Sequence, residues 1–238
     1  MTAITFRDLA GMDEFFAAEA LQRTVWGEGD KEDPADLMMV VQHEGGLAAG
    51  AFRDGRLMGY LFGFPTREAD VQHSHRLAVH PDARGLGLGL RLKWYQRDWC
   101  LAHGISRVRW TYDPLRHANA SLNIARLGAR ASVYYPDYYG VMQGINAGVP
   151  SDRLRADWHL ADASVAARAT GAAASLPDAP GMIRIPIPAD FGAMIASDPD
   201  GATGERLRLR AAMTAAFADG YEVQGYDTAR REYLLLPA

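Results

Sequence analysis

The spacing of apolar positions predicts alternating strands and helices over the first two thirds of the chain. Two apolar runs joined by Asp54 and Gly55 predict a hairpin over residues 47–64, because this dipeptide tolerates the positive φ angles of a tight turn. Further strands are expected at residues 3–9, 71–80, 106–113 and 153–160, and helices at residues 11–26, 33–46, 84–103 and 117–128. Asp33 is the expected cap of the second helix. Residues 131–140, rich in tyrosine, indicate an aromatic strand or loop.

The pattern changes after residue 161. Residues 162–181 lose large apolar side chains and gain Ala, Gly and Pro, which is the composition of a linker. An edge strand with prolines at 182–188, a helix at 204–220 and a closing strand pair are expected beyond it. We therefore expect a core at 1–161, a linker at 162–181 and an extension at 182–238, too small to fold alone and packed on the core.

Composition and charge narrow the class of protein. Hydrophobic residues make up 48% of the 238-residue chain, charged residues make up 23%, and the net charge is -4. These values suit a globular protein without the basic surface that nucleic acid needs. We expect neither a signal peptide nor a membrane span. The single cysteine, Cys100, excludes an intrachain disulfide and favours the cytoplasm; we expect a packed thiol rather than a nucleophile.

The stretch "RGLGLG", Arg84 to Gly89, lies between a predicted strand and a predicted helix. The dinucleotide fingerprint requires a third glycine where Leu92 stands, and the P-loop requires a Ser or Thr after Lys93. The spacing that fits is R-x-x-G-x-G. Its glycines allow the backbone to approach a diphosphate, and the helix N-terminus donates N–H groups to it. The alternative is a glycine-rich helix start shaped for close packing.

This loop resembles the acyl-CoA pyrophosphate loop, [RQ]-x-x-G-x-[GA], of the GNAT superfamily of N-acetyltransferases, and "LAVHPDARG" resembles the strand and turn before it. The resemblance covers about residues 3 to 160. The tracts "HSHRLAVHPDARGLGLGLRLK" and "TYDPLRHANASLNIARLGA" are similar to a group of predicted acetyltransferases with a C-terminal extension. The resemblance to the GNAT superfamily implies an α/β (α+β) fold: a mixed, mostly antiparallel twisted sheet flanked by helices, with a C-terminal α/β extension.

The resemblance also implies which residues contact acetyl-CoA, the expected co-substrate, with no metal. Backbone groups near Leu77 and Val79 would pair with the pantetheine arm like an added strand. The diphosphate would lie on Arg84, Gly85, Leu86, Gly87, Leu88 and Gly89, and Asn119 and Asn123 would lie near the thioester.

Acyl transfer to an amine needs a base that deprotonates the ammonium. Many GNAT enzymes use a glutamate on the fourth strand, whereas this sequence offers His73 and His75. Both share parity with Leu77 and Val79, so all four side chains should face one side unless a bulge intervenes. His73 is the first candidate because it lies closest to the family's base position; the alternative is a polar strand end.

Two further positions are candidates for the chemistry. Asp113 ends the next strand, where it would anchor an amine, orient a histidine or form a turn before Pro114. The tyrosine that protonates the leaving thiolate in many GNAT members is replaced by Ile124. Tyr139 is the candidate for that role, and packing is the alternative for the tyrosines of this region.

The sequence therefore predicts an acetyl-CoA-dependent N-acetyltransferase that acts on the amine of a small molecule or amino acid by direct attack in a ternary complex. The alternative is an acyl-CoA-binding sensor or scaffold without turnover, favoured by Ile124. A third possibility is a longer acyl group, with room provided by Gly59 and Gly63. A homodimer is compatible with the sequence, and the acceptor is not specified by it.

Overall fold

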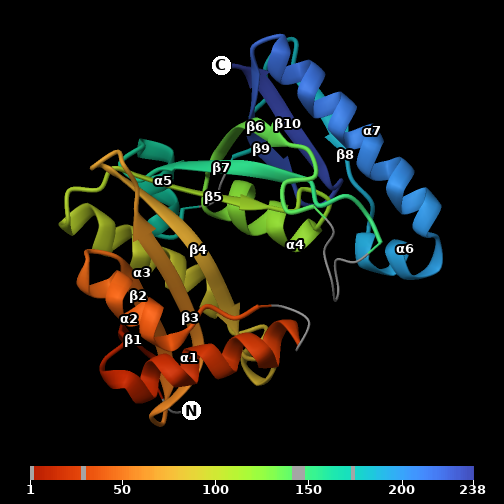
Figure 1. The fold of residues 1–238 in the computed structure, drawn as a ribbon. Coiled ribbons are helices and arrows are strands. Elements are labelled where there is room, and N and C mark those ends of the chain that lie inside the picture. Colours follow the sequence, from red (N-terminus) through yellow and green to blue (C-terminus); the bar gives the residue numbers. More distant parts are fainter. Residues whose placement is uncertain (1–2, 28–30, 141–147, 173–174) are drawn as a thin grey trace. The chain divides into compact units, whose positions relative to one another are not determined.

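The computed structural model describes residues 3–27, 31–140, 148–172 and 175–238, which form two compact units, residues 1–109 and 110–238 (Figure 1). Unit 1 contains β1 (Thr5–Asp8), β2 (Leu47–Arg53), β3 (Arg56–Pro65), β4 (Val71–Val79) and the start of β5 (Arg107–Tyr112), in that spatial order. Its strands pair antiparallel except for β4 and β5, which run parallel. Its helices are α1 (Gly11–Trp26), α2 (Ala35–His43) and α3 (Leu88–Ala102), with a short 3-10 turn at Pro81–Ala83.

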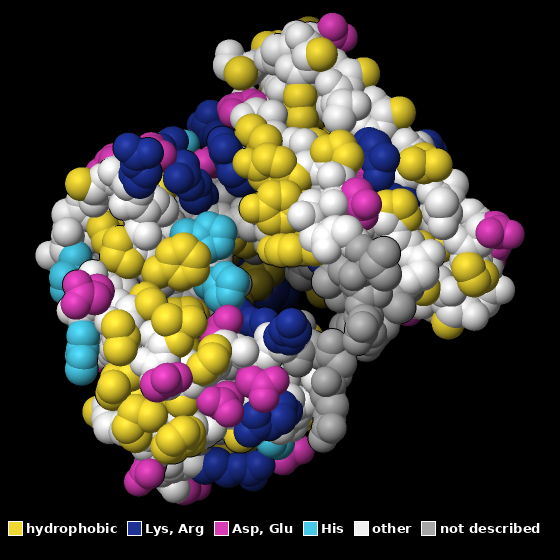
Figure 2. Space-filling model, viewed as in Figure 1, with side chains coloured by type: hydrophobic (Ala, Val, Ile, Leu, Met, Phe, Trp, Pro, Cys, Tyr) yellow, Lys and Arg dark blue, Asp and Glu magenta, His cyan; other side chains and the backbone are white. Residues whose placement is uncertain are grey.

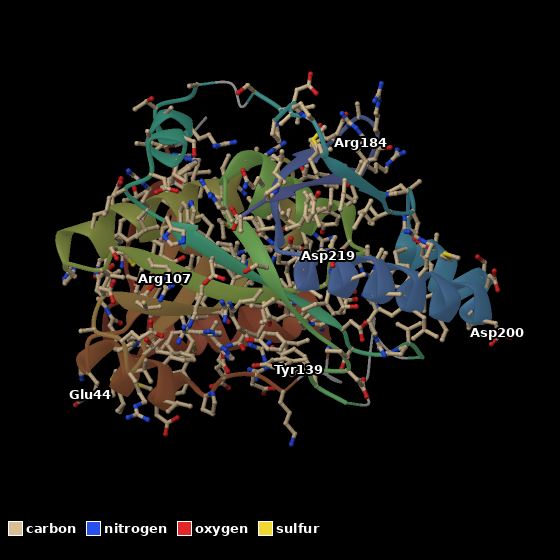
Figure 3. The ribbon with its side chains drawn as sticks, turned by 90° about the horizontal axis from the view of Figure 1, so that it is seen from above. Glu44, Arg107, Tyr139, Arg184, Asp200 and Asp219 are labelled. Carbon is tan, nitrogen blue, oxygen red and sulfur yellow. The ribbon has the colours of Figure 1, made fainter. Side chains whose placement is uncertain are left out.

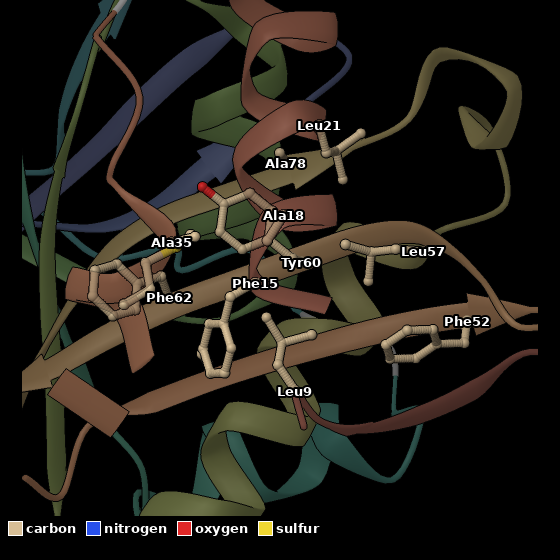
Figure 4. Packing of buried hydrophobic residues seen from close by; sticks show 12 residues of the cluster. Leu9, Phe15, Ala18, Leu21, Ala35, Phe52, Leu57, Tyr60, Phe62 and Ala78 are labelled. Carbon is tan, nitrogen blue, oxygen red and sulfur yellow. The ribbon is translucent and has the colours of Figure 1, made fainter. Parts of the chain in front are cut away.

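Helices cover both faces of the unit 1 sheet. Alternate residues of β2 and β3 point to opposite faces, so each strand contributes to two clusters. The first cluster buries Phe15 and Leu21 of α1 and Met38 of α2 against Tyr60 and Phe62 of β3 (Figure 4). The second buries residues of α3 and of the sheet, among them Leu47, Ala49, Met58, Leu61, Leu88 and Leu92. Burial on both faces explains the almost continuous apolar runs of β2 and β3.

The predicted hairpin is confirmed. Asp54 and Gly55 have φ angles of 53° and 75° and join β2 to β3. Two predicted helix starts in unit 1 are wrong. Asp33 does not cap α2. The N–H of Ala35, at the start of α2, instead donates to the Glu19 carboxylate of α1 at 2.8 Å. The third helix begins at Leu88 rather than residue 84.

Unit 2 holds a second set of strands, in the order β7-β6-β9-β10-β8, all antiparallel where their pairing is given. The strands are β6 (Arg130–Tyr135), β7 (Arg153–His159), β8 (Ile183–Pro186), β9 (Tyr221–Asp227) and β10 (Glu232–Pro237). The helices are α4 (His117–Ala120), which continues as a π-helix at Ser121–Arg126, α5 (Ala163–Ala169), α6 (Phe191–Ser197) and α7 (Pro199–Ala218). The proline-containing strand β8 lies at the sheet edge, as predicted.

The fold class is confirmed as mixed α+β, with a mostly antiparallel open sheet and flanking helices. Two helices were not predicted: α6, and α5 within the alanine-rich segment that we expected to be a linker. In the described part of the chain, no helix has the length and apolar character needed to cross a membrane.

Candidate functional site

The edge of β4 is the first feature of the site. Its parallel pairing with β5 ends at His73 and Arg109, so within the described residues the rest of β4 has a partner on one side only, β3. The N–H of His80 donates to the carbonyl of Met58 on β3 at 2.8 Å. Since successive residues of a strand direct their backbone groups to alternate sides, those of Leu77 and Val79 point away from β3. An extended ligand can pair with them there.

The loop after β4 ends in the N-terminus of α3. Gly85 and Gly87 adopt φ angles of 80° and 69°, and a Cβ atom at either would meet no atom within 4 Å. No side chain caps α3. Its first backbone hydrogen bond runs from the N–H of Arg91 to the carbonyl of Gly87. The preceding N–H groups of the helix start are therefore available to an anion, and the exposed Arg84 adds a positive charge. This arrangement fits a diphosphate.

The helix start also packs closely on β4. Leu88 is buried, whereas Leu86 is exposed at the tip of the loop. A Cβ at Gly89 would lie 3.7 Å from the Leu77 side chain and 3.8 Å from the Val79 side chain, which is ordinary van der Waals contact, so this turn of α3 lies against β4. The Leu77 and Val79 side chains belong to the α3 face of the sheet.

The two histidines lie on the opposite face, because a bulge interrupts β4. Phe62 pairs with Arg76 and Gly63 pairs with Ser74, which leaves His75 without a counterpart on β3. The His73 ring stacks on Phe64 at 4.9 Å, and the His75 ring lies 5.5 Å from Phe64 and 6.0 Å from the His73 ring. The prediction that both histidines share a face with Leu77 and Val79 is therefore wrong. Figure 2 shows histidine side chains beside hydrophobic ones on the face in view.

His75 is held by the carboxylate of Asp33, which the sequence analysis predicted to be a helix cap. Its Nε2 lies 3.1 Å from Oδ1 of Asp33, and Oδ2 of Asp33 lies 3.1 Å from Nε of Arg76. Arg76 also lies over the ring of Trp26. The carboxylate thus fixes one nitrogen of a partly exposed imidazole and leaves the other, Nδ1, for proton transfer.

His73 has a different environment. Burial, together with the charges of His75, Lys93 and Arg109, lowers the pKa of His73 to about 4. The ring is therefore neutral at neutral pH and is a much weaker base than an ordinary histidine.

A buried polar cluster that the sequence did not reveal lies under β4 on the α3 side. Lys93 is 2% exposed and donates to Ser74 Oγ at 2.8 Å and to Gln96 Oε1 at 3.1 Å. Gln96 donates to Gln72 at 2.7 Å, and the Cys100 thiol also donates to Gln72, at 3.4 Å. Burial lowers the pKa of Lys93 to about 7 and raises the pKa of Cys100 to about 12, so this thiol is packed rather than reactive.

Within unit 2, the Asp113 carboxylate is committed to an ion pair. It accepts two hydrogen bonds from Arg206 of α7, at 2.6 and 2.9 Å, and one from the N–H of Leu115. Asn119 donates to the backbone carbonyl of Asp113 at 3.4 Å, and Asn123 is buried in the π-helix. Asp113 therefore has the contacts of a structural residue.

Tyr139 is an exposed residue of unit 2 (Figure 3). It is 55% exposed, its OH lies 3.4 Å from Thr111 Oγ1, and Arg153 lies over its ring. Ile124, at the position of the missing tyrosine, is buried. Within the described ranges, no group of three or more His, Cys, Asp or Glu side chains is arranged to hold a metal ion.

Comparison with solved structures shows that this fold is that of acetyltransferases. The ribosomal-protein-S18-alanine N-acetyltransferase of Escherichia coli superimposes with a TM-score of 0.56 at 18% identity, over 68% of this chain and 96% of that one. Aminoglycoside 6'-acetyltransferase type Ii gives 0.55 at 16% identity, over 66% and 98%. The yncA protein of Salmonella typhimurium, solved with its cofactor acetyl-CoA, gives 0.54 at 18% identity, over 67% and 95%.

The model of the acetyltransferase (GNAT) family matches residues 12–128. Residues 12–128 therefore form an acetyltransferase domain of the GNAT family, as the loop at 84–89 indicated. No curated protein matches the sequence.

Proposed function

We propose that this protein is an acetyl-CoA-dependent N-acetyltransferase that acetylates the amine of a small molecule or amino acid by direct attack in a ternary complex. The observation that carries the proposal is the arrangement along β4. Among the described residues, the edge of β4 beyond His73 has no partner strand on the β5 side. The same strand carries His75, bound to a carboxylate, and continues into the glycine loop at the N-terminus of α3.

The donor would be held mostly by backbone groups. The groups of Leu77 and Val79 that point away from β3 would pair with the two amides of pantetheine. The diphosphate would accept from the N–H groups at the start of α3, with Arg84 as counter-ion. Bound acetyl-CoA would supply the activated thioester.

His75 is the base that we propose. Asp33 accepts from its Nε2–H, so Nδ1 is free to take a proton from the ammonium of the acceptor. The neutral nitrogen then forms a bond to the thioester carbonyl carbon as the carbon–sulfur bond breaks. The first proton passes through His75 to solvent, and a second passes from the nitrogen to the departing thiolate. His73, with its pKa near 4, would stay neutral and would only pack beside His75, stacked on Phe64.

Tyr139, an exposed residue of unit 2, stays the candidate from the sequence for relaying this second proton to the thiolate. A thiolate is a tolerable leaving group, so this acid is less important than the base.

Calorimetric titration with coenzyme A tests the donor site. We expect Arg84→Glu to weaken binding about 100-fold, because a charge-assisted contact becomes a repulsion. Arg84 is exposed, so the circular dichroism spectrum should not change. Arg67→Glu makes the same charge change on an exposed residue at the other end of β4 and should leave the affinity unchanged. Equal affinities for wild type and Arg84→Glu would remove the loop from the proposal.

A further inference from the structure

A cavity of about 380 Å³ opens on the α1–α2 face of unit 1, beside His75. Its walls come from α2 and from the ends of β3 and β4, and they are mostly apolar: Leu37, Val40, Val41, Phe62, Phe64 and Pro65. Its polar lining residues are Asp33, Glu44 and His75. This size and composition are typical of a site for a small molecule.

The apolar residues of α2 that line the cavity are not needed for packing in the hydrophobic core. Ala35 and Met38 are the residues of this helix buried in unit 1. Leu37 and Val40 lie on the other side of the helix, and each is 50% exposed. A surface helix normally presents polar residues on that side, and exposed apolar groups that gather at a concave site indicate a ligand.

The charges of the lining favour a cation. Two carboxylates line the cavity, and neither lysine nor arginine does so among the described residues. Asp33 shares its charge with Arg76, whereas Glu44 stands at the C-terminal end of α2 (Figure 3). An ammonium group is therefore attracted to this cavity, and an acidic molecule is repelled.

We infer that this cavity binds the apolar body of the acceptor, and that the acceptor is a primary amine carrying an alkyl or aryl group. The inference rests on the proposed function. The apolar group would pack between α2 and the rings of Phe62 and Phe64, and the amine would lie toward His75, which contacts both rings. A polyhydroxylated or acidic amine would leave this wall unfilled or meet the carboxylates.

Two amines, 2-phenylethylamine and ethanolamine, separate the contribution of the apolar group to kcat/KM from that of the amine. With acetyl-CoA saturating, we expect kcat/KM for 2-phenylethylamine to exceed that for ethanolamine by about 10- to 100-fold, the range that an apolar pocket provides. Leu37→Asp should remove most of this preference, which is measured as the ratio of the two kcat/KM values. Leu101→Asp makes the same change on an exposed residue of α3, which packs on the other face of the sheet, and should alter neither rate.

Equilibrium binding of 2-phenylethylamine to the protein with coenzyme A is measured in parallel. Equal kcat/KM values for both amines, unaffected by Leu37→Asp, would overturn this inference and leave the proposed function standing. Binding to the wild type but not to Leu37→Asp, without release of thiol, would support the cavity and overturn the proposed function. Absence of both binding and turnover would overturn both.

Discussion

His75 combines exposure with a fixed orientation, and this combination separates it from its neighbour. Asp33 lies 3.1 Å from its Nε2, while the pKa of His73 falls to about 4 through burial and nearby positive charge. An accessible histidine that is oriented by a carboxylate is well suited to proton transfer. We therefore propose His75 as the base in place of His73, the first candidate from the sequence.

We expect His75→Gln to lower kcat about 100-fold or more at pH 7 and to leave coenzyme A affinity unchanged, because a general base contributes about 10² to 10⁴ in rate. The defect should shrink as pH rises toward the pKa of the acceptor amine, since solvent then supplies the neutral nucleophile. A pH–rate profile measures this change. His103→Gln, at the C-cap of α3, is the control. A defect of constant size at every pH would indicate a structural role and remove the base from His75.

Local spacing alone is enough to predict the residues of the donor loop. Arg84, Gly87 and their neighbours follow one motif, and the motif requires only adjacent positions. Asp33 was missed because it lies 42 positions from His75, and because Asp before Pro resembles an ordinary helix cap. The bulge in β4 was allowed for but not located, since no sequence signal marks which residue is left unpaired.

At the scale of elements, β4 and α3 are joined by a polar cluster where apolar packing would be expected. Lys93, Ser74, Gln96 and Gln72 form a hydrogen-bonded chain between them, directly beneath the part of β4 where pairing with β5 ends. Buried polar networks of this kind fix one arrangement of the packed elements when their groups are satisfied. We infer that this chain holds the register of α3 on the bulged strand.

Lys93 should make the stability of the protein depend on pH. Its pKa falls from 10.5 to about 7 on folding, so between these values the unfolded chain binds more protons than the folded one. Stability contributed by the neutral amine is therefore gained as pH rises. Relative to Lys93→Met, the wild type should gain up to about 1.4 kcal/mol in the free energy of unfolding per pH unit above pH 7, or about 2 kcal/mol from pH 7 to 9.

Urea unfolding at these two pH values measures the difference. Lys31→Met, which changes an exposed lysine, should show no such pH dependence relative to the wild type. A gap between wild type and Lys93→Met that stays constant from pH 7 to 9 would show that Lys93 keeps an ordinary pKa.

Elements with strong periodicity were predicted well, and their ends were not. The predicted boundaries of α1 agree with the structure, because its apolar face packs on the sheet throughout. The start of α3 was placed too early because Gly85 and Gly87 take left-handed conformations that interrupt the helix. The cap of α2 comes from Glu19 of another helix, a contact that depends on tertiary packing.

At the scale of the whole molecule, the C-terminal residues are integral to unit 2. Strand β9 pairs with β6, and α7 contributes two bidentate ion pairs, Arg206 with Asp113 and Arg210 with Asp152. The side chains of Arg206 and Asp113 are almost fully buried, so removal of either partner would leave a buried charge uncompensated. The sequence predicted α7 and strands β8, β9 and β10 but neither α6 nor these ion pairs, because helical spacing identifies α7 without revealing what its arginines contact.

We propose that this GNAT domain transfers an acetyl group to an amine. The most direct measurement incubates the full chain with acetyl-CoA carrying a ¹³C-labelled acetyl group and with 2-phenylethylamine, and quantifies free thiol and labelled amide by mass spectrometry. The account predicts amide and thiol in equal amounts, at a rate proportional to protein concentration. Binding of acetyl-CoA with no labelled amide from this or any other amine would contradict it and favour a protein that binds acyl-CoA without turnover.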